Sequence, residues 1–155
     1  MMGFDKLIFH LKRIINTNLP GNDSHQKMKV DSRKKINFPF TINKAKPAAV
    51  LLLLYTKNNQ IFFYLTKRTE DLKYHKGQIS LPGGSKETGE SLLETALRET
   101  EEEIGINKNK ISILGAITPL FIPITGFIMT PFIGFISKEP IIKLDSREVD
   151  EIFSV

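Results

Sequence analysis

Glutamates crowd the second half of one predicted helix, and their spacing gives this chain its candidate chemistry. The stretch from Gly84 to Ile106 reads GSKETGESLLETALRETEEEIGI. At about 100° per residue, Glu99 and Glu103 border the apolar side of the helix, with Glu102 just beyond them. Carboxylate oxygens at this spacing suit a hard cation such as Mg²⁺ or Mn²⁺. These three glutamates are therefore the candidate metal ligands.

The C-terminal end of this helix carries unfavourable charge. Glu101, Glu102 and Glu103 fill the last turn before Gly105, a residue typical of helix C-termini. The helix macrodipole disfavours each negative charge there by roughly 0.3 to 1 kcal/mol, and Glu99 and Glu103 repel each other. A sequence that breaks local rules in this way often marks a functional site. The alternative is a solvated acidic helix face with no chemistry.

The loop before the helix favours the functional interpretation. Gly84, Glu90 and Arg98 precede the glutamates in the pattern G-x5-E-x7-R-E-U-x-E-E-x-G-U, where U is a bulky aliphatic residue. The pattern resembles the signature of the Nudix hydrolases, with Thr100 departing at the first U. Because that position faces the core, the departure concerns packing more than chemistry.

The resemblance implies an enzyme that hydrolyses a nucleoside diphosphate linked to another group. Glu99, Glu103 and Glu102 would hold metal ions that neutralise the pyrophosphate and activate a water for attack on phosphorus. The implied fold is α/β (α+β), a mixed β-sheet sandwiched between α-helices.

Other positions of the signature imply supporting roles. Arg98 would orient a glutamate by ion pairing, and Glu90 would brace the loop. By motif position Glu102 is also the best candidate for the general base, while Glu148 and Glu151 stay open as alternatives. The chain has no cysteine nucleophile, and no Ser/His/Asp set is suggested by spacing.

A basic, glycine-rich stretch follows the predicted strand at residues 61–66. A guanidinium fork and an ammonium group at a strand end both suit phosphate, and glycines let the backbone approach a ligand. Taken alone, these could be ordinary loop residues. The candidate substrate-binding residues are Lys67, Arg68, His75, Gly77, Gln78, Gly83 and Gly84.

This stretch resembles the second signature of the coenzyme A pyrophosphatase branch of the Nudix family, L-L-T-x-R-[SA]-x3-R-x3-G-x3-F-P-G-G. Thr69, Lys73 and Leu81 depart from Ser or Ala, Arg and Phe. The resemblance implies hydrolysis of the pyrophosphate bond of coenzyme A or its derivatives, giving adenosine 3′,5′-bisphosphate and 4′-phosphopantetheine or its acyl form. The alternatives are hydrolysis of ADP-ribose or another nucleoside diphosphate derivative, and a non-catalytic nucleotide- or RNA-binding module.

Composition indicates one domain and a polyanionic small-molecule ligand. The chain has 155 residues, a net charge of +5 and no cysteine, which excludes disulfides and thiolate metal sites and fits a reducing compartment, so we expect a cytoplasmic protein. Residues 84–106 carry −5 and the remainder +10. An acidic metal site in basic surroundings suits a nucleotide bridged by cations, although a lysine-rich solubility surface has the same composition.

Residues 1–46 are expected to precede the hydrolase domain at 47–155. Apolar residues recur at helical spacing from Phe4 to Ile15, which predicts an amphipathic helix that ends near residues 18–21 and docks on the domain or a partner. Its apolar run is too short for a signal peptide or a membrane span. Residues 22–46 are polar and basic and are expected to form an irregular linker, with no nucleic-acid partner expected.

The domain itself is predicted to contain several strands. Residues 48–55 and 61–66 form a predicted hairpin around residues 57–60, and Pro131 predicts a bulge or an edge in its strand. Further predicted strands lie at residues 111–117, 127–136 and 141–144, with a turn at 146–151 before an apolar segment at 152–155.

The end of the chain suggests that a segment is missing. Members of the resembled family continue past such a segment with a helix that covers one sheet face. We therefore expect a chain truncated relative to that family, with the apolar residues of 127–136, Ile152 and Phe153 left uncovered.

Overall fold

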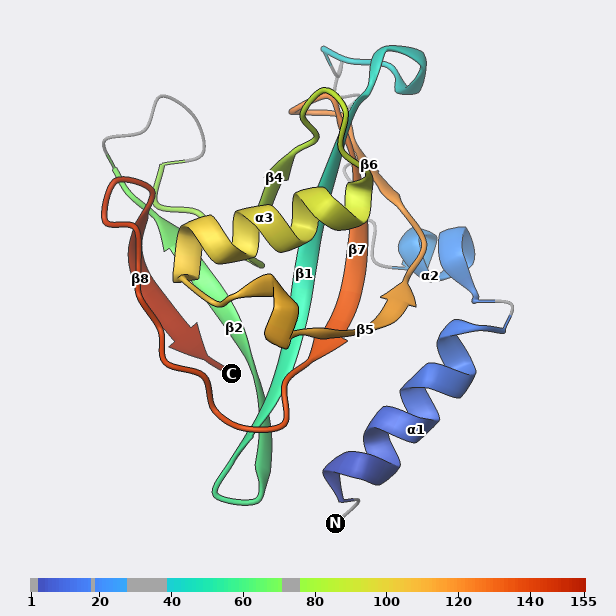
Figure 1. The fold of residues 1–155 in the computed structure, drawn as a ribbon. Coiled ribbons are helices and arrows are strands. Elements are labelled where there is room, and N and C mark those ends of the chain that lie inside the picture. Colours follow the sequence, from blue (N-terminus) through green and yellow to red (C-terminus); the bar gives the residue numbers. More distant parts are fainter. Residues whose placement is uncertain (1–2, 18, 28–38, 71–75) are drawn as a thin grey trace.

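The structure is a computed structural model that describes residues 3–17, 19–27, 39–70 and 76–155. Its centre is a mixed sheet in the order β3 (Ile79–Ser80), β2 (Gln60–Arg68), β1 (Lys46–Lys57), β7 (Phe127–Phe135) and β5 (Ser112–Ala116). Off this path, β4 (Gly83–Ser85) pairs with β1, β6 (Leu120–Ile122) with β7, and β8 (Val149–Ser154) with β2. Figure 1 shows α3 (Leu92–Ile104) lying across the sheet and α1 (Phe4–Ile15) beside β5. The predicted mixed sheet between helices is confirmed.

The sheet begins with a long hairpin of β1 (Lys46–Lys57) and β2 (Gln60–Arg68). Its two turn residues, Asn58 and Asn59, have φ of 52° and 59°. Asparagine tolerates this left-handed region, and a two-residue turn of this kind matches the twist of paired strands. The predicted hairpin is confirmed, with strands longer than predicted.

Strand β1 separates the two halves of the core. Leu51, Leu53 and Tyr55 pack in the cluster that contains α3, whereas Leu52 and Leu54 pack in the cluster that contains α1. Successive side chains of a strand point to opposite faces, so α1 and α3 cover opposite faces of the sheet. Within the sheet, β1 pairs antiparallel with β2 along one edge and parallel with β7 (Phe127–Phe135) along the other.

Helix α1 docks on the domain, as predicted, and ends at Ile15, earlier than predicted. Its residues Phe4, Ile8, Leu11 and Ile15 pack against the cluster formed by Leu54, Leu114 and Ile133. Every apolar residue from 127 to 136, together with Ile152 and Phe153, is buried or half-buried. Phe132, Ile136 and Ile152 pack in the cluster that contains α3, and Ile133 and Phe135 pack in the cluster that contains α1. The prediction of missing cover is therefore wrong for these residues.

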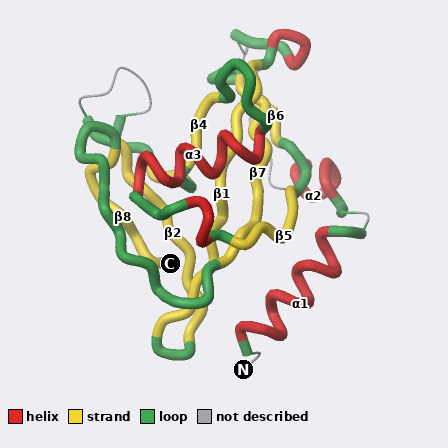
Figure 2. The backbone as a smooth tube through the Cα atoms, in the orientation of Figure 1, coloured by secondary structure: helices red, strands yellow, loops and turns green. Residues whose placement is uncertain are grey.

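Two predictions for the connecting segments are also wrong. Part of the expected irregular linker forms α2 (Gly21–Lys27) and a 3₁₀ turn, η1 (Ile42–Lys44); residues 28–38 lie outside the described ranges. Residues 141–144 form no strand. Ile142 and Leu144 pack into the α3 side of the core, while the Lys143 N–H donates to the Ile104 carbonyl at 3.0 Å. Figure 2 shows this irregular segment passing the C-terminal end of α3 on its way to β8.

The remaining strands are short. The predicted strand at 111–117 is confirmed as β5 (Ser112–Ala116), and β8 (Val149–Ser154) begins earlier than the predicted segment. Sequence did not predict β3 (Ile79–Ser80), β4 (Gly83–Ser85), β6 (Leu120–Ile122) or the 3₁₀ turn η2 (Lys108–Lys110).

Pro131 lies in β7, an interior strand, so the predicted edge is wrong. It stands where the outer neighbour of β7 changes from β6 to β5. The register shift occurs in β5, between Ile113 and Gly115, rather than at the proline.

Within the described ranges, each helix is too short or too polar to cross a bilayer.

Candidate active site

Helix α3 is fixed at both ends by its own sequence. The Ser91 hydroxyl accepts from the Glu94 N–H at 3.2 Å, and the Glu94 carboxylate accepts from the Ser91 N–H at 2.7 Å. This capping box satisfies two otherwise free donors. Gly105 ends the helix, as predicted, and has φ of 71°, in the left-handed region that glycine adopts easily. Thr100, the departure from the signature, is buried and donates to the Ala96 carbonyl at 2.7 Å.

The three predicted ligands differ sharply in burial. The side chains of Glu103 and Glu99 are 3% and 14% exposed, whereas that of Glu102 is 56% exposed. Two glutamates therefore face the sheet, and the third lies at the rim. Among the described residues, no three His, Asp or Glu side chains form a ready-made metal-binding group.

Arg98 joins the loop and the glutamates. It donates two hydrogen bonds of 3.1 Å to Glu90, pairs with Glu99 at 3.0 Å and Glu102 at 2.8 Å, and reaches the Ser85 carbonyl at 3.3 Å. These charge-assisted bonds hold the pKa of Glu90 at about 2, chiefly through Arg98. The arrangement agrees with the expected ion pairing by Arg98.

Glu90 ties the loop to the helix. Its carboxylate also accepts from the Glu87 N–H at 2.7 Å and the Thr95 hydroxyl at 2.8 Å. Because one carboxylate joins the loop backbone, the first turn of α3 and Arg98, the geometry suits the bracing expected of Glu90.

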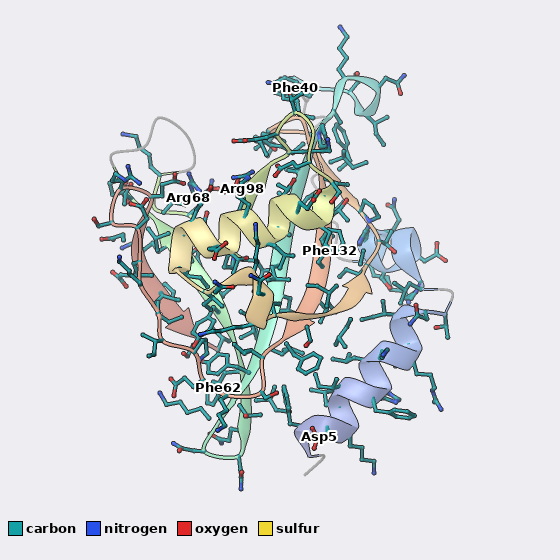
Figure 3. All side chains as sticks on the ribbon, viewed as in Figure 1. Asp5, Phe40, Phe62, Arg68, Arg98 and Phe132 are labelled. Atoms are coloured by element: carbon teal, nitrogen blue, oxygen red, sulfur yellow. The ribbon has the colours of Figure 1, made fainter. Side chains whose placement is uncertain are left out.

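Strand β2 brings Arg68 next to Glu103, the most buried of the three glutamates. Figure 3 labels Arg68 beside α3, together with Arg98. Arg68 Nη1 lies 3.4 Å from Glu103, and Nη2 lies 3.8 Å from Glu148. The Thr66 hydroxyl, two residues earlier on the same strand face, donates to Glu103 at 3.4 Å. Sequence analysis did not single out Thr66, although its two-residue spacing from Arg68 was a usable signal.

Burial controls the charge state of the two inner glutamates. It raises the pKa of Glu103 to about 8, opposed by Arg68 and increased further by Glu99 and Glu148. Burial likewise raises the pKa of Glu99, opposed by Arg98. Ionising both carboxyls here is costly unless more positive charge is supplied.

Residues 45–154 match the family model described as the NUDIX domain. The chain belongs to the Nudix family. Nudix hydrolase 3 of Caenorhabditis elegans is 37% identical over 110 residues, which cover 69% of this chain and 46% of that protein. The Nudix hydrolase NudL of Pectobacterium atrosepticum is 35% identical over 115 residues, which cover 74% and 59%.

The chain thus spans roughly half the length of these relatives. Among solved structures, a C. elegans Ap4A hydrolase binary complex matches with a TM-score of 0.62 at 22% identity, over 71% of this chain and 79% of that one. This likeness establishes the shared Nudix fold alone. The predicted family is therefore confirmed. Nudix hydrolases generally use divalent metal ions.

The residues present fit such a cation. The donors are all carboxylates, the kind that Mg²⁺ and Mn²⁺ prefer. Around the two inner carboxylates, the neighbouring arginines offset only part of the effect of burial on the pKa. A Cβ added at Gly84 would collide with the Glu99 carboxylate, so the glycine leaves room for this ligand. A cation would be held by Glu99 and Glu103, with Glu102 joining from the rim.

Of the predicted substrate-binding residues, Lys67 faces different partners from Arg68. Its ammonium group pairs with Asp150 at 2.8 Å and with Glu151 at 3.1 Å, both on β8. A change of register between Lys67 and Arg68 accompanies this divergence. Glu151 is therefore engaged with Lys67, whereas Glu148 faces Arg68.

The other predicted residues shape the backbone near Arg68. The Gly77 N–H donates to the Arg68 carbonyl at 3.2 Å, and the Arg68 N–H donates to the Gln78 carbonyl at 3.0 Å. Gly83 pairs with β1 so closely that a Cβ would collide with the β1 backbone. His75 lies outside the described residues.

Proposed function

We propose that this Nudix chain hydrolyses the pyrophosphate bond of coenzyme A or a derivative, releasing adenosine 3′,5′-bisphosphate and 4′-phosphopantetheine or its acyl form. The supporting observation is that Arg68 of the second signature meets Glu103 of the first at 3.4 Å. A phosphate-binding group and a carboxylate of the proposed metal site thus lie side by side, as suits a substrate that carries a further phosphate besides its pyrophosphate.

The α3 carboxylates and Arg98 would have different roles, metal binding and positioning. Glu99, Glu103 and Glu102 would hold Mg²⁺ or Mn²⁺, which would neutralise pyrophosphate charge and activate a water. Arg98 is a positioning residue, because it pairs with Glu99 and Glu102 while Glu90 anchors it. Its rigid guanidinium keeps the carboxylates oriented while substrate binds.

Glu102 is the proposed general base. Its half-exposed carboxylate at the rim can take a proton from a water at the buried pair and pass it to solvent. Glu148 is the next candidate, since it faces Arg68 and adds to the pKa shifts of Glu99 and Glu103. Pairing with Lys67 makes Glu151 less suited.

Substrate recognition would rest on Arg68. A guanidinium fork binds phosphate oxygens in pairs, and the positive charge outside the glutamate helix favours a polyanion. The terminal 3′-phosphate separates coenzyme A from ADP-ribose, so it is the group that we assign to this fork.

A substrate panel tests the proposal. Coenzyme A, an acyl derivative, ADP-ribose and a dinucleoside polyphosphate are each incubated with Mg²⁺ or Mn²⁺, and products are separated by chromatography. We expect adenosine 3′,5′-bisphosphate from coenzyme A in the wild type and at least about 100-fold less of it from Glu103→Gln. Faster turnover of ADP-ribose would favour that substrate instead. Metal binding without turnover of any substrate would indicate a non-catalytic nucleotide-binding domain.

A further inference from the structure

Arg68 is held more loosely than its surroundings suggest. Its two ion pairs, 3.4 Å to Glu103 and 3.8 Å to Glu148, are longer than the ~2.7 to 2.9 Å typical of charge-assisted bonds. Its Nε is buried, and no group of the described residues forms a hydrogen bond with it. A buried donor without an acceptor is unfavourable, so the present position of Arg68 leaves part of its bonding capacity unused.

Arg98, the other arginine that contacts the α3 glutamates, is held more tightly than Arg68. It makes contacts of 2.8 to 3.3 Å with Glu90, Glu99, Glu102 and a backbone carbonyl. Its contacts use Nε and both Nη atoms and connect it to the loop before α3. Of the two guanidinium groups, Arg68 is therefore the one that can leave its carboxylate at low cost.

Glu103 is the group on which two cations would converge. Its buried carboxylate already faces the Arg68 guanidinium, and it is also a proposed ligand of the divalent ion. Two positive charges at one buried carboxylate repel each other strongly, because screening by water is weak there. Binding of the metal and retention of the Arg68 contact therefore oppose each other.

We propose that Arg68 is a displaceable counter-ion: it competes with the divalent cation for Glu103, and the cation releases its guanidinium to bind a substrate phosphate. The inference rests on the proposed function, since it needs a cation at the α3 glutamates. Once released, the fork meets phosphate oxygens that satisfy Nη and Nε together. Metal and substrate then bind in order, and the substrate's phosphate takes the place of Glu103 as the partner of Arg68.

The competing explanation is a permanent structural ion pair. In that case Arg68 stays on Glu103 with metal bound and helps to hold the ligand in place. Removing Arg68 would then weaken metal binding or leave it unchanged. The two explanations thus predict opposite changes in metal affinity.

The test is a calorimetric titration with Mn²⁺ and no substrate, in an alkaline buffer so that protons compete little with the cation. Arg68→Gln removes the charge and keeps most of the length. Lys67→Gln is the matched control, because it removes one charge from the adjacent residue, which pairs with Asp150 and Glu151 instead. Arg68→Lys keeps the charge without the fork. Circular dichroism in EDTA verifies that each variant is folded.

We expect Arg68→Gln to bind Mn²⁺ about tenfold tighter than the wild type, which corresponds to ~1.4 kcal/mol. Lys67→Gln and Arg68→Lys should each change the Mn²⁺ affinity by less than about threefold. The Lys67 charge pairs with Asp150 and Glu151 rather than with Glu103, and Arg68→Lys keeps a positive charge beside Glu103. Unchanged or weaker binding by Arg68→Gln overturns the inference, as does equal tightening in Lys67→Gln.

The outcome is independent of the substrate assignment. Tighter Mn²⁺ binding in Arg68→Gln, with no hydrolysis of coenzyme A by the wild type, would support the counter-ion and overturn the proposed function. Hydrolysis of coenzyme A by the wild type, with an unchanged Mn²⁺ affinity in Arg68→Gln, would support the proposed function and overturn the counter-ion.

Discussion

Replacing Glu103 with glutamine should stabilise the protein at alkaline pH when a chelator removes metal. The folded state holds the Glu103 proton up to a pKa of about 8, compared with an ordinary value of 4.5. Between these values the folded state binds more protons than the unfolded chain, so the free energy of unfolding falls as pH rises. Above the folded-state pKa the loss is complete. Glutamine has no proton to lose and avoids this loss.

The expected gain is a balance of two effects. Raising the pKa of Glu103 from 4.5 to about 8 corresponds to roughly 4 to 5 kcal/mol at ~1.4 kcal/mol per unit. Glutamine also weakens the contacts with Arg68 and Thr66, both 3.4 Å long, at about 1 kcal/mol each. We therefore expect Glu103→Gln to exceed the wild type by about 2 to 3 kcal/mol at alkaline pH and to fall about 2 kcal/mol below it at acidic pH, where only the weakened contacts count.

Urea unfolding in EDTA, followed by circular dichroism across the pH range, measures this difference. The matched control is Glu102→Gln, which changes the neighbouring, 56% exposed carboxylate and should shift stability by no more than about 0.5 kcal/mol at any pH. Parallel pH curves for the wild type and Glu103→Gln would refute the assignment of a buried, proton-holding carboxyl at position 103. With Mn²⁺ present the order should reverse, because only the wild type keeps the ligand charge; hydrolysis by the variant should fall at least about 100-fold.

Three further substitutions test separate parts of the site. Arg68→Ala should raise KM for coenzyme A about tenfold more than for a substrate lacking the 3′-phosphate, since a lost fork–phosphate pair is worth ~1.4 kcal/mol or more; equal effects on both substrates would exclude that contact. Gly84→Ala should push the Glu99 carboxylate aside and weaken Mn²⁺ binding about tenfold in a calorimetric titration, with little change in melting temperature because a flexible side-chain end can move. Ser91→Ala should cost about 1 kcal/mol in urea unfolding through loss of the cap, and an unchanged midpoint would contradict the capping role.

Helix α3 was predictable because its determinants are local. Its period, the glycine at its end and the spacing of its acids all lie within one short stretch of sequence. The helical angle placed Glu99 and Glu103 on the inner side and Glu102 farther out, as observed. The capping box at Ser91 was equally local and could have been predicted from its S-x-x-E spacing.

Long-range packing decided the features that sequence analysis missed. Residues 141–144 alternate in burial as a strand would, with Ile142 and Leu144 inside. Their backbone, however, bonds to the end of α3 at Ile104 rather than to a neighbouring strand. Residue types predicted that Arg68 suits phosphate, but its contact with Glu103 depends on where β2 lies relative to α3. The cover that α1 gives to the sheet is likewise a tertiary feature.

The unfavourable charge of α3 is tolerated because other parts of the same helix hold it in place. Ala96, Thr100 and Ile104 are fully buried on the helix face that meets β1, and the ends are fixed by the Ser91 cap and by Gly105. Apolar packing and capping therefore keep the two inner carboxylates in a buried environment that raises the pKa of both. A divalent cation relieves this cost directly, because its charge favours the ionised carboxylates that burial opposes. The same packing that makes these carboxyls costly in isolation is what should give the site its affinity for metal.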